Sequence, residues 1–289
     1  MVPIEAGNDF DQHHIHTHPS QIKMSFFSEI KNKEAKVNVA DKTFIGKNVV
    51  LGSRCKEINI GYGCFIGNDI YIDVDYLTIG DYTTIHHGSI IHGVKTQIGH
   101  NCWFGHYTII DSLGGNTRIG NNVGVGAHSQ LWSHMKFGDV LNGCRWNSSS
   151  SLTLDDDVWL VGHSIVGPIH AKEKSMLMTG GVAVKDMESN SIYAGSPAKD
   201  VSDRFGVQFE EVAHEEKCRR FLQLRAEFCS ANAIDENLFV LVDEFAHQAA
   251  VTQFNLHKRS YRPIRSEAEY QFIKFMLYDK AKWLPALAA

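Results

Sequence analysis

The most regular feature of the chain is an aliphatic residue, usually followed by a small one, that recurs about every six residues between positions 40 and 130. Three such units would close one turn, so we expect Ile60, Ile79 and Ile98 to stack on successive turns. The aliphatic side chain would point inward and the small residue would leave room at the corner. The repeat positions are Ile45, Leu51, Ile60, Ile66, Ile72, Ile79, Ile85, Ile91, Ile98, Phe104, Ile110, Ile119 and Val125. The pattern predicts an all-β fold, a parallel β-helix, because only a stack of turns buries the apolar face of each one.

Other architectures fit the repeat less well. A TIM barrel or a doubly wound sheet needs helical patterns of about 10–15 residues between strands, and residues 40–130 contain none. A β-sandwich has strands at a spacing of roughly 8–12 residues, which is longer than the period seen here.

Two segments interrupt the repeat. Residues 112–116 (SLGGN) predict a short loop at one corner. Residues 132–153 are polar and rich in Ser, Asn and Gly, and they predict a long structureless loop of the kind that often carries function. The repeat resumes at Leu154, continues through Leu160 and Val166, and ends near Val201.

The tail has a different pattern. Residues 208–227 predict an amphipathic helix, and residues 238–242 and 251–255 predict short strands. Ser266 and Glu269 form a capping box that would open a last helix. The apolar anchors of the two helices would be Phe209, Val212, Phe221 and Leu224, then Phe272, Phe275 and Met276. We therefore predict a partly disordered leader (1–38), a β-helix domain (39–201) with the loop 132–153, and a small α-rich C-terminal domain (202–289) that caps the helix or assists assembly.

Composition narrows the function classes. The formal net charge is −5, so nothing suggests a nucleic-acid partner. No apolar run approaches the ~20 residues of a membrane span, and the polar N-terminus does not resemble a secretory signal. The six cysteines lack a C-x-x-C pair and predict reduced, mostly buried thiols in a cytoplasmic protein.

Several motifs carry a resemblance to a known family. They are His134 in the long loop, Val158-Trp159-Leu160, Gly180-Gly181, Val184-Lys185-Asp186 and Gly195-Ser196-Pro197-Ala198-Lys199. Over about residues 40–201 the chain resembles the hexapeptide-repeat acetyltransferases, most of all the sugar and xenobiotic branch with galactoside, maltose and nodulation-factor acetyltransferases. The resemblance implies a left-handed helix, a homotrimer, and acetyl-CoA bound with a small-molecule acceptor in the groove between two subunits.

The same resemblance suggests roles for residues near the acceptor. His134 would be the catalytic base, a task that suits histidine because its ordinary pKa of ~6.5 lies near working pH. His106 occupies the place of the family's asparagine and would help to hold the oxyanion, while Trp132 would lie at the acceptor site. His128, one repeat before His134, would have a supporting role on the coil face. Asp111 would either orient an acceptor hydroxyl or serve as a corner residue.

A second set would contact acetyl-CoA. Lysines beside phosphates would form charge-assisted hydrogen bonds, glycines would let the backbone approach the pantetheine arm, and a tryptophan would pack beneath the groove. The set is Trp159, Gly162, Thr179, Gly180, Lys185, Pro197 and Lys199. The resemblance thus implies an acetyl-CoA-dependent O-acetyltransferase that acts on a sugar or a surface-polysaccharide precursor and needs no metal.

Two alternatives remain open. The γ-class carbonic anhydrases share this fold and bind zinc with three histidines at the trimer interface. His92, His100 and His106 would supply these ligands; the last two are six residues apart here and five apart in those enzymes. A β-helix that serves only as a scaffold is the other. The leader motif His13-His14-Ile15-His16-Thr17-His18 resembles a metal motif, but adventitious binding explains it better.

Overall fold

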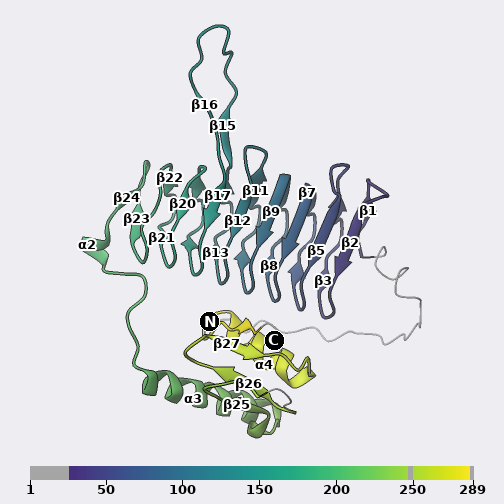
Figure 1. The fold of residues 1–289 in the computed structure, drawn as a ribbon, viewed down its shortest axis with the longest axis vertical. Helices are drawn as coiled ribbons and strands as arrows, with labels where there is room; N and C mark the ends of the chain where they lie inside the picture. The colour runs from purple at the N-terminus through teal and green to yellow at the C-terminus, as the bar shows by residue number, and fades with distance from the viewer. Residues whose placement is uncertain (1–25, 247–249, 287–289) are drawn as a thin grey trace, which may run out of the picture.

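The computed structural model describes residues 26–246 and 250–286. The histidine-rich leader motif lies outside these residues. Two long sheets form most of the described chain (Figure 1). The thirteen-stranded sheet contains β1 (Glu29–Ile30), β2 (Lys36–Val39), β4 (Val50–Leu51), β5 (Glu57–Ile60), β7 (Tyr71–Ile79), β9 (Ile90–Ile98), β11 (Ile109–Ser112), β12 (Thr117–Ile119), β14 (Gln130–Leu131), β17 (Leu152–Leu154), β19 (Ile165–Val166), β20 (His170–Ala171) and β22 (Val182–Ala183).

The nine-stranded sheet closes the helix. It contains β3 (Phe44–Ile45), β6 (Phe65–Ile66), β8 (Thr84–Ile85), β10 (Trp103–Phe104), β13 (Gly124–Val125), β18 (Trp159–Leu160), β21 (Met176–Leu177), β23 (Ile192–Ala194) and β24 (Lys199–Asp200). Neighbouring strands in both sheets are parallel, except that β23 and β24 are antiparallel. The predicted parallel β-helix is confirmed, and its left-handedness stays a prediction.

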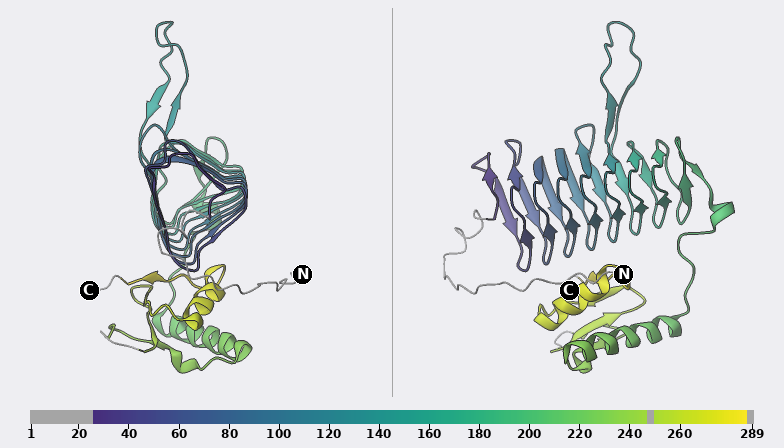
Figure 2. Two further views of the ribbon diagram at one scale, coloured as in Figure 1. Left: turned by 90° about the vertical axis from the view of Figure 1, so that its right-hand side faces the viewer. Right: turned by 180° about the vertical axis from the view of Figure 1, so that it is seen from behind.

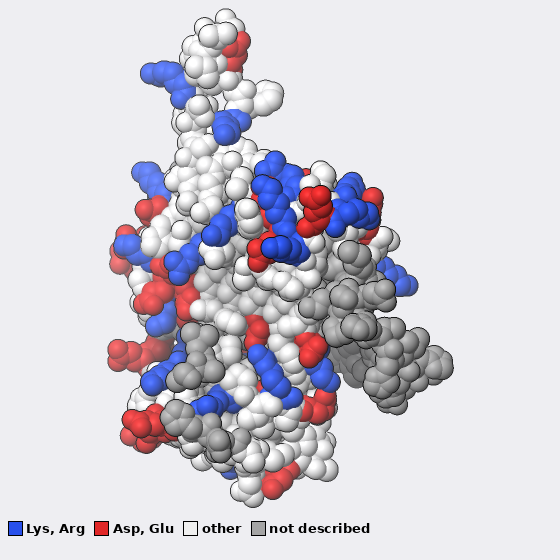
Figure 3. Space-filling view, turned by 45° about the vertical axis from the view of Figure 1, so that its right-hand side comes forward, with Lys and Arg blue, Asp and Glu red and all other residues white. Residues whose placement is uncertain are grey.

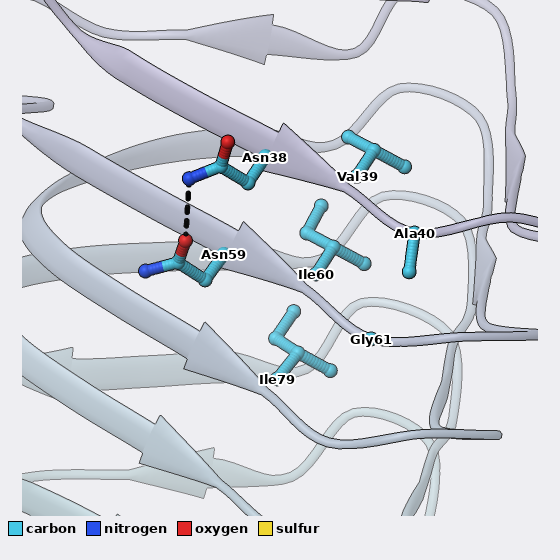
Figure 4. A pocket seen from close by; sticks show the side chains of 7 residues that line it. All are labelled: Asn38, Val39, Ala40, Asn59, Ile60, Gly61 and Ile79. Atoms are coloured by element: carbon cyan, nitrogen blue, oxygen red, sulfur yellow. Dashed lines mark hydrogen bonds between the residues drawn. The ribbon is translucent and has the colours of Figure 1, made fainter.

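The repeat residues stack as expected. Ile60 pairs with Ile79, Ile79 with Ile98, and Ile98 with Ile119, and all four side chains are buried. Figure 4 shows the start of this stack, in which Val39, Ile60 and Ile79 lie in line. Asn38 donates a hydrogen bond to Asn59 beside them, over 2.9 Å. Since β1 and β2 already pair with later turns, the helix begins at Glu29 and not at the predicted boundary of residue 39.

Seen along its axis, the helix is triangular (Figure 2). We name its corners by what they carry. The histidine corner joins the nine-stranded sheet to the following strand, at residues 86–88, 105–107, 126–128, 161–163 and 178–180. The loop corner follows β11 and β14 and carries the two loops. The domain corner, at residues 61–64, 80–83, 99–102, 120–123 and 155–158, faces the C-terminal domain.

The histidine corner has no room for a side chain at Gly126. A Cβ there would lie 2.2 Å from the backbone nitrogen of Gly162 and 2.5 Å from its Cα. Backbone cannot move aside cheaply, so Gly126→Ala is expected to lower the free energy of unfolding by about 1–3 kcal/mol. Gly167→Ala is the matched control, because its Cβ would meet only the Ala183 carbonyl oxygen at 3.7 Å. Denaturation curves that shift equally for both variants would contradict this account.

The long loop is not structureless. Strands β15 (His134–Lys136) and β16 (Asn147–Ser149) form an antiparallel hairpin that projects from the loop corner (Figures 1 and 2). Backbone pairing between His134 and Ser149 anchors its base. The prediction missed the hairpin because its strands are short and lack apolar alternation. The helix resumes at the buried Leu152, slightly before the predicted Leu154.

The C-terminal part combines helices with a small sheet. It contains α2 (Ser202–Phe205), α3 (His214–Asn232), the 3₁₀ helix η1 (Glu236–Leu238), β25 (Phe239–Leu241), β26 (Thr252–Asn255), β27 (Ser260–Arg262), α4 (Glu267–Leu277) and β28 (Leu284–Pro285). The four strands form one sheet, and β25 and β26 lie where the sequence predicted short strands. The helix predicted from residue 208 starts later, which leaves Phe209 and Val212 ahead of it. The last helix opens as predicted, because the Ser266 side chain accepts a hydrogen bond from the Glu269 amide over 3.1 Å.

This domain packs along the domain corner of the β-helix (Figure 1). A cap would lie over one end of the helix, so the domain does not cap it as predicted. Arg259 donates two hydrogen bonds to Asp157, over 2.6 and 2.9 Å, and Arg265 donates one to Asp81 over 2.8 Å. Asn101 donates to the Trp283 carbonyl over 2.9 Å. The buried Tyr82 ring joins the aromatic core of the domain. The predicted role in assembly stays a prediction.

The described surface has two further features. Each of the six cysteines is free; Cys144 and Cys218 are partly exposed and the other four are buried. Positive and negative side chains are intermixed on the face drawn in Figure 3. Among the helices of the described residues, none has the length and apolar character needed to cross a bilayer.

Candidate active site

The base of the hairpin holds a histidine–carboxylate pair. His134 Nδ1 lies 2.8 Å from Asp111 Oδ1. Asp111 is fully buried, while the His134 side chain keeps 19% of its exposure. Ser133 donates to the same carboxylate through its amide, over 3.1 Å, and its hydroxyl, over 2.6 Å, and the Leu113 amide donates over 3.1 Å. The carboxylate is therefore saturated with donors.

The chain brings the two residues together through strand register. Asp111 follows Ile110 in β11, and Ile110 pairs with Leu131 in β14. The chain then leaves the helix at Trp132, and the hairpin starts at His134 directly beside the buried carboxylate. The corner position of Asp111 and the loop position of His134 thus become neighbours on adjacent turns.

These contacts fix the charge and the tautomer. Burial acts to raise the pKa of Asp111, but the hydrogen bonds from Ser133, His134 and Leu113 outweigh it, so the net pKa is lowered. An ionised carboxylate only accepts hydrogen bonds, so His134 must donate through Nδ1–H. Nε2 then carries the free lone pair, which is the form a general base needs.

The Asp111 carboxylate is enclosed by protein groups. Its oxygens face Ser133, His134 and Leu113, and no part of the side chain reaches solvent. Whether Asp111 orients an acceptor hydroxyl, as the sequence suggested, stays a prediction; within one chain its described contacts are with the hairpin base and with His92.

Two more rings lie at the histidine–carboxylate pair. Trp132 lies edge-on to His134 with ring centroids 6.0 Å apart. His92 lies edge-on to Trp132 at 6.3 Å, and its Nε2 is 3.5 Å from Asp111 Oδ2. The sequence analysis did not predict His92 as a neighbour of Asp111. The signal was available in the stacking of turns, which pairs His92 with Asp111.

The other two predicted acceptor-site histidines lie elsewhere in the chain. His106 is at the histidine corner, where its ring contacts His86 and His87. His128 stacks between Tyr107 and His163 at the same corner, with centroids 5.2 and 5.1 Å away. Within one chain, neither residue is placed beside His134, so His106 cannot serve there as the oxyanion donor of its own subunit.

The residues predicted to contact acetyl-CoA lie on the last turns. Thr179, Gly180, Lys185, Pro197 and Lys199 are all exposed. Gly180 has φ of +70°, and a Cβ there would meet nothing within 4 Å, so a ligand can approach its backbone closely. No ion-pair partner of Lys185 or Lys199 is found in the described chain. That these residues contact acetyl-CoA stays a prediction.

The two remaining residues of that set pack against the coils. Trp159 extends over Gly124, where a Cβ would lie 3.2 Å from the tryptophan Cδ1, and the ring stays partly exposed. Gly162 accepts a hydrogen bond from the Gly180 amide over 3.1 Å and so lies one turn from it.

The histidines of the zinc alternative are not brought together. His92 is at the loop corner beside Asp111, and His106 is at the histidine corner. His100 is at the domain corner, where its Nδ1 accepts the Asp81 amide over 2.8 Å. A zinc site needs its nitrogen ligands within ~2.0–2.1 Å of one ion. One chain therefore cannot form the site predicted from His92, His100 and His106.

Comparisons with known proteins agree with the fold. No protein-family model matches the chain. It is 26% identical over 192 residues to the bifunctional protein GlmU of Streptococcus suis (strain 98HAH33), covering 61% of this chain and 39% of that protein. It is 25% identical over 192 residues to the mitochondrial gamma carbonic anhydrase 2 of Arabidopsis thaliana, covering 65% and 56%. The chain thus spans less than two thirds of either relative.

Among solved structures, the chain resembles the polysialic acid O-acetyltransferase OatWY. The match has a TM-score of 0.51 and 19% identity, and covers 65% of this chain and 93% of that one. The predicted resemblance to hexapeptide-repeat O-acetyltransferases is therefore confirmed in the fold. The described chain is a hexapeptide-repeat β-helix protein with a histidine–carboxylate pair at the base of a hairpin.

Proposed function

We propose that the protein is an acetyl-CoA-dependent O-acetyltransferase whose acceptor is a sugar or a precursor of a surface polysaccharide. The observation that carries the proposal is the His134–Asp111 pair, since it leaves Nε2 of a partly exposed imidazole free to accept a proton. The fold shared with a polysialic acid O-acetyltransferase supports a saccharide acceptor. The proposal also includes a cytoplasmic homotrimer.

In the proposed reaction, His134 Nε2 takes the proton of an acceptor hydroxyl as that oxygen bonds to the thioester carbonyl carbon. Asp111 stabilises the imidazolium that forms, because its carboxylate is already ionised and aligned with Nδ1–H. When the carbon–sulfur bond breaks, His134 returns the proton to the leaving thiolate. Backbone amides at the groove would hold the oxyanion.

The test is acceptor-dependent release of free CoA thiol. Purified protein, acetyl-CoA and a panel of saccharides, starting with polysialic acid and N-acetylated hexosamines, should release thiol only when an acceptor is present. Calorimetry without acceptor should show acetyl-CoA binding. A protein that binds no acetyl-CoA and releases no thiol with any acceptor would sink the proposal and favour the scaffold alternative.

The two exposed lysines give a separate prediction. Replacing Lys185 or Lys199 with alanine should weaken acetyl-CoA binding by about tenfold each, because one charge-assisted hydrogen bond to a phosphate is worth ~1.5–3 kcal/mol. Lys95→Ala is the matched control, since Lys95 is equally exposed but lies on β9. Calorimetry that finds the same Kd in all three variants would remove the lysines from the site.

A further inference from the structure

The histidine corner holds a second cluster that the proposed acetyl transfer does not use. Each of His86, His87 and His106 offers one ring nitrogen, and these three atoms lie within 4.8 Å of one another. The ring centroids are 4.7 Å apart for His86 and His106, and 5.2 Å apart for His87 and His106. Within the described residues, no other group of three metal-ligating side chains is this close.

Turn stacking explains why these histidines meet. Phe104 pairs with Ile85, so the residues that follow each strand lie one above the other. His106 therefore sits over His87, and His86 reaches the same space from one position earlier. His92 and His100 belong to the other two corners of the same chain.

A second observation points to a missing partner. Nδ1 of His86 is buried and makes no hydrogen bond in the described structure. Buried polar atoms are nearly always satisfied, and an absent ion is one ordinary explanation of an exception.

The surroundings favour a borderline metal ion. Phe65 and Trp103 pack against His86, with centroids 5.6 and 5.0 Å away, and shield one side of the cluster from water. His106 is exposed, so the opposite side is open to solvent. Three imidazole nitrogens with one open position suit Zn²⁺ or Co²⁺, whereas Ca²⁺ and Mg²⁺ prefer oxygen ligands.

We propose that His86, His87 and His106 form a binding site for a divalent transition metal ion such as Zn²⁺, which leaves a fourth position for water. His87 Nδ1 accepts a hydrogen bond from the Asn68 amide over 2.6 Å. Metal coordination through either ring nitrogen would give up this hydrogen bond, because a neutral imidazole that binds a metal through Nε2 carries its proton on Nδ1, and one that binds through Nδ1 has no free lone pair there. The inference reverses the expectation of a metal-free protein and does not depend on the proposed acetyl transfer.

The experiment must first prevent the histidines of the N-terminal leader from competing for the metal ion. The full chain carries His13, His14, His16 and His18, which bind metal by themselves, so all four are replaced with alanine in every sample. This background protein is stripped with a chelator and titrated with Co²⁺. We expect about one Co²⁺ per chain, with the visible absorption bands of a tetrahedral nitrogen site.

The variants then locate the ion. His86→Ala and His106→Ala should each lower Co²⁺ affinity by about 100-fold or more, because each removes one of three protein ligands. His163→Ala, at the same corner but outside the cluster, should bind as the background does. Circular dichroism checks that each variant is folded. If His86→Ala or His106→Ala does not fold, His86→Gln or His106→Gln is used in its place.

Three outcomes would overturn the proposal. They are no stoichiometric Co²⁺ in the background protein, undiminished binding by the His86 and His106 variants, and loss of binding in His92→Ala or His100→Ala instead. Because the readout is metal binding, its failure leaves the acetyltransferase proposal untouched. Conversely, a protein that binds Co²⁺ as expected but releases no CoA thiol would retain the metal site and lose the transferase.

Discussion

Acetyl transfer by His134→Ala should fall by about 10²–10⁴-fold in kcat, because the variant lacks the base that takes the proton from the acceptor. Acetyl-CoA should still bind with an unchanged Kd, since the predicted donor contacts lie on the last turns of the helix. The measurement is CoA thiol release under saturating substrates, combined with calorimetry. A variant that keeps near-wild-type turnover would show that His134 is not the base.

A matched histidine control separates this effect from a general loss of stability. His163 is a partly exposed histidine on the same β-helix, stacked on His128 and remote from the pair with Asp111. His163→Ala should retain wild-type turnover. If both variants lost activity equally, the loss would reflect damage to the helix and not to the chemistry.

The second large effect is expected from Asp111→Asn. The amide has nearly the same shape but no charge, and its NH₂ group would face the donors of Ser133. Turnover should fall by about 10²–10⁴-fold, because His134 loses both its fixed tautomer and the charge that stabilises the imidazolium. The buried donors left unpaired should also lower the free energy of unfolding by about 1–3 kcal/mol.

The pH dependence of stability provides the internal check on Asp111. Its pKa is lower in the folded protein, so its contribution to stability is complete above the ordinary carboxyl pKa of ~3.9 and disappears as pH falls through the folded value. Wild-type protein should therefore lose stability below about pH 4 more steeply than Asp111→Asn. Thermal denaturation from pH 7 to pH 3 measures the difference. Parallel curves would show that the carboxylate is not held by these hydrogen bonds.

Ser133→Ala tests whether the carboxylate needs all of its donors. The hydroxyl donates one hydrogen bond over 2.6 Å, while the Ser133 amide, the Leu113 amide and His134 remain. Loss of one such bond should lower the free energy of unfolding by about 1.5–3 kcal/mol. Turnover should fall less than in Asp111→Asn, because the charge of Asp111 and its hydrogen bond from His134 both remain. If turnover fell equally in Ser133→Ala and Asp111→Asn, the loss would be due to the Ser133 hydroxyl group and not to the charge of Asp111.

The sequence by itself determined the helix. A period of about six residues with an aliphatic position in each unit admits few other folds, because each turn must bury its apolar side chains against the next. The stacking of Ile60, Ile79 and Ile98 followed from that period alone. The sequence also singled out His134, because it occupies the place of the loop histidine in the family that the chain resembles.

The tertiary structure decided which side chains meet. Asp111 and Ile110 are adjacent in sequence, yet the partner of Asp111 is fixed by the register of β11 against β14 and by the hairpin that starts at His134. Likewise His86, His87 and His106 converge because successive turns stack, whereas His92 and His100 lie at other corners. The repeat determines which residues point into the helix. A few extra residues in one turn change which residues lie above one another at the corners of successive turns. That alignment depends on the register of every strand, which a local sequence pattern does not contain.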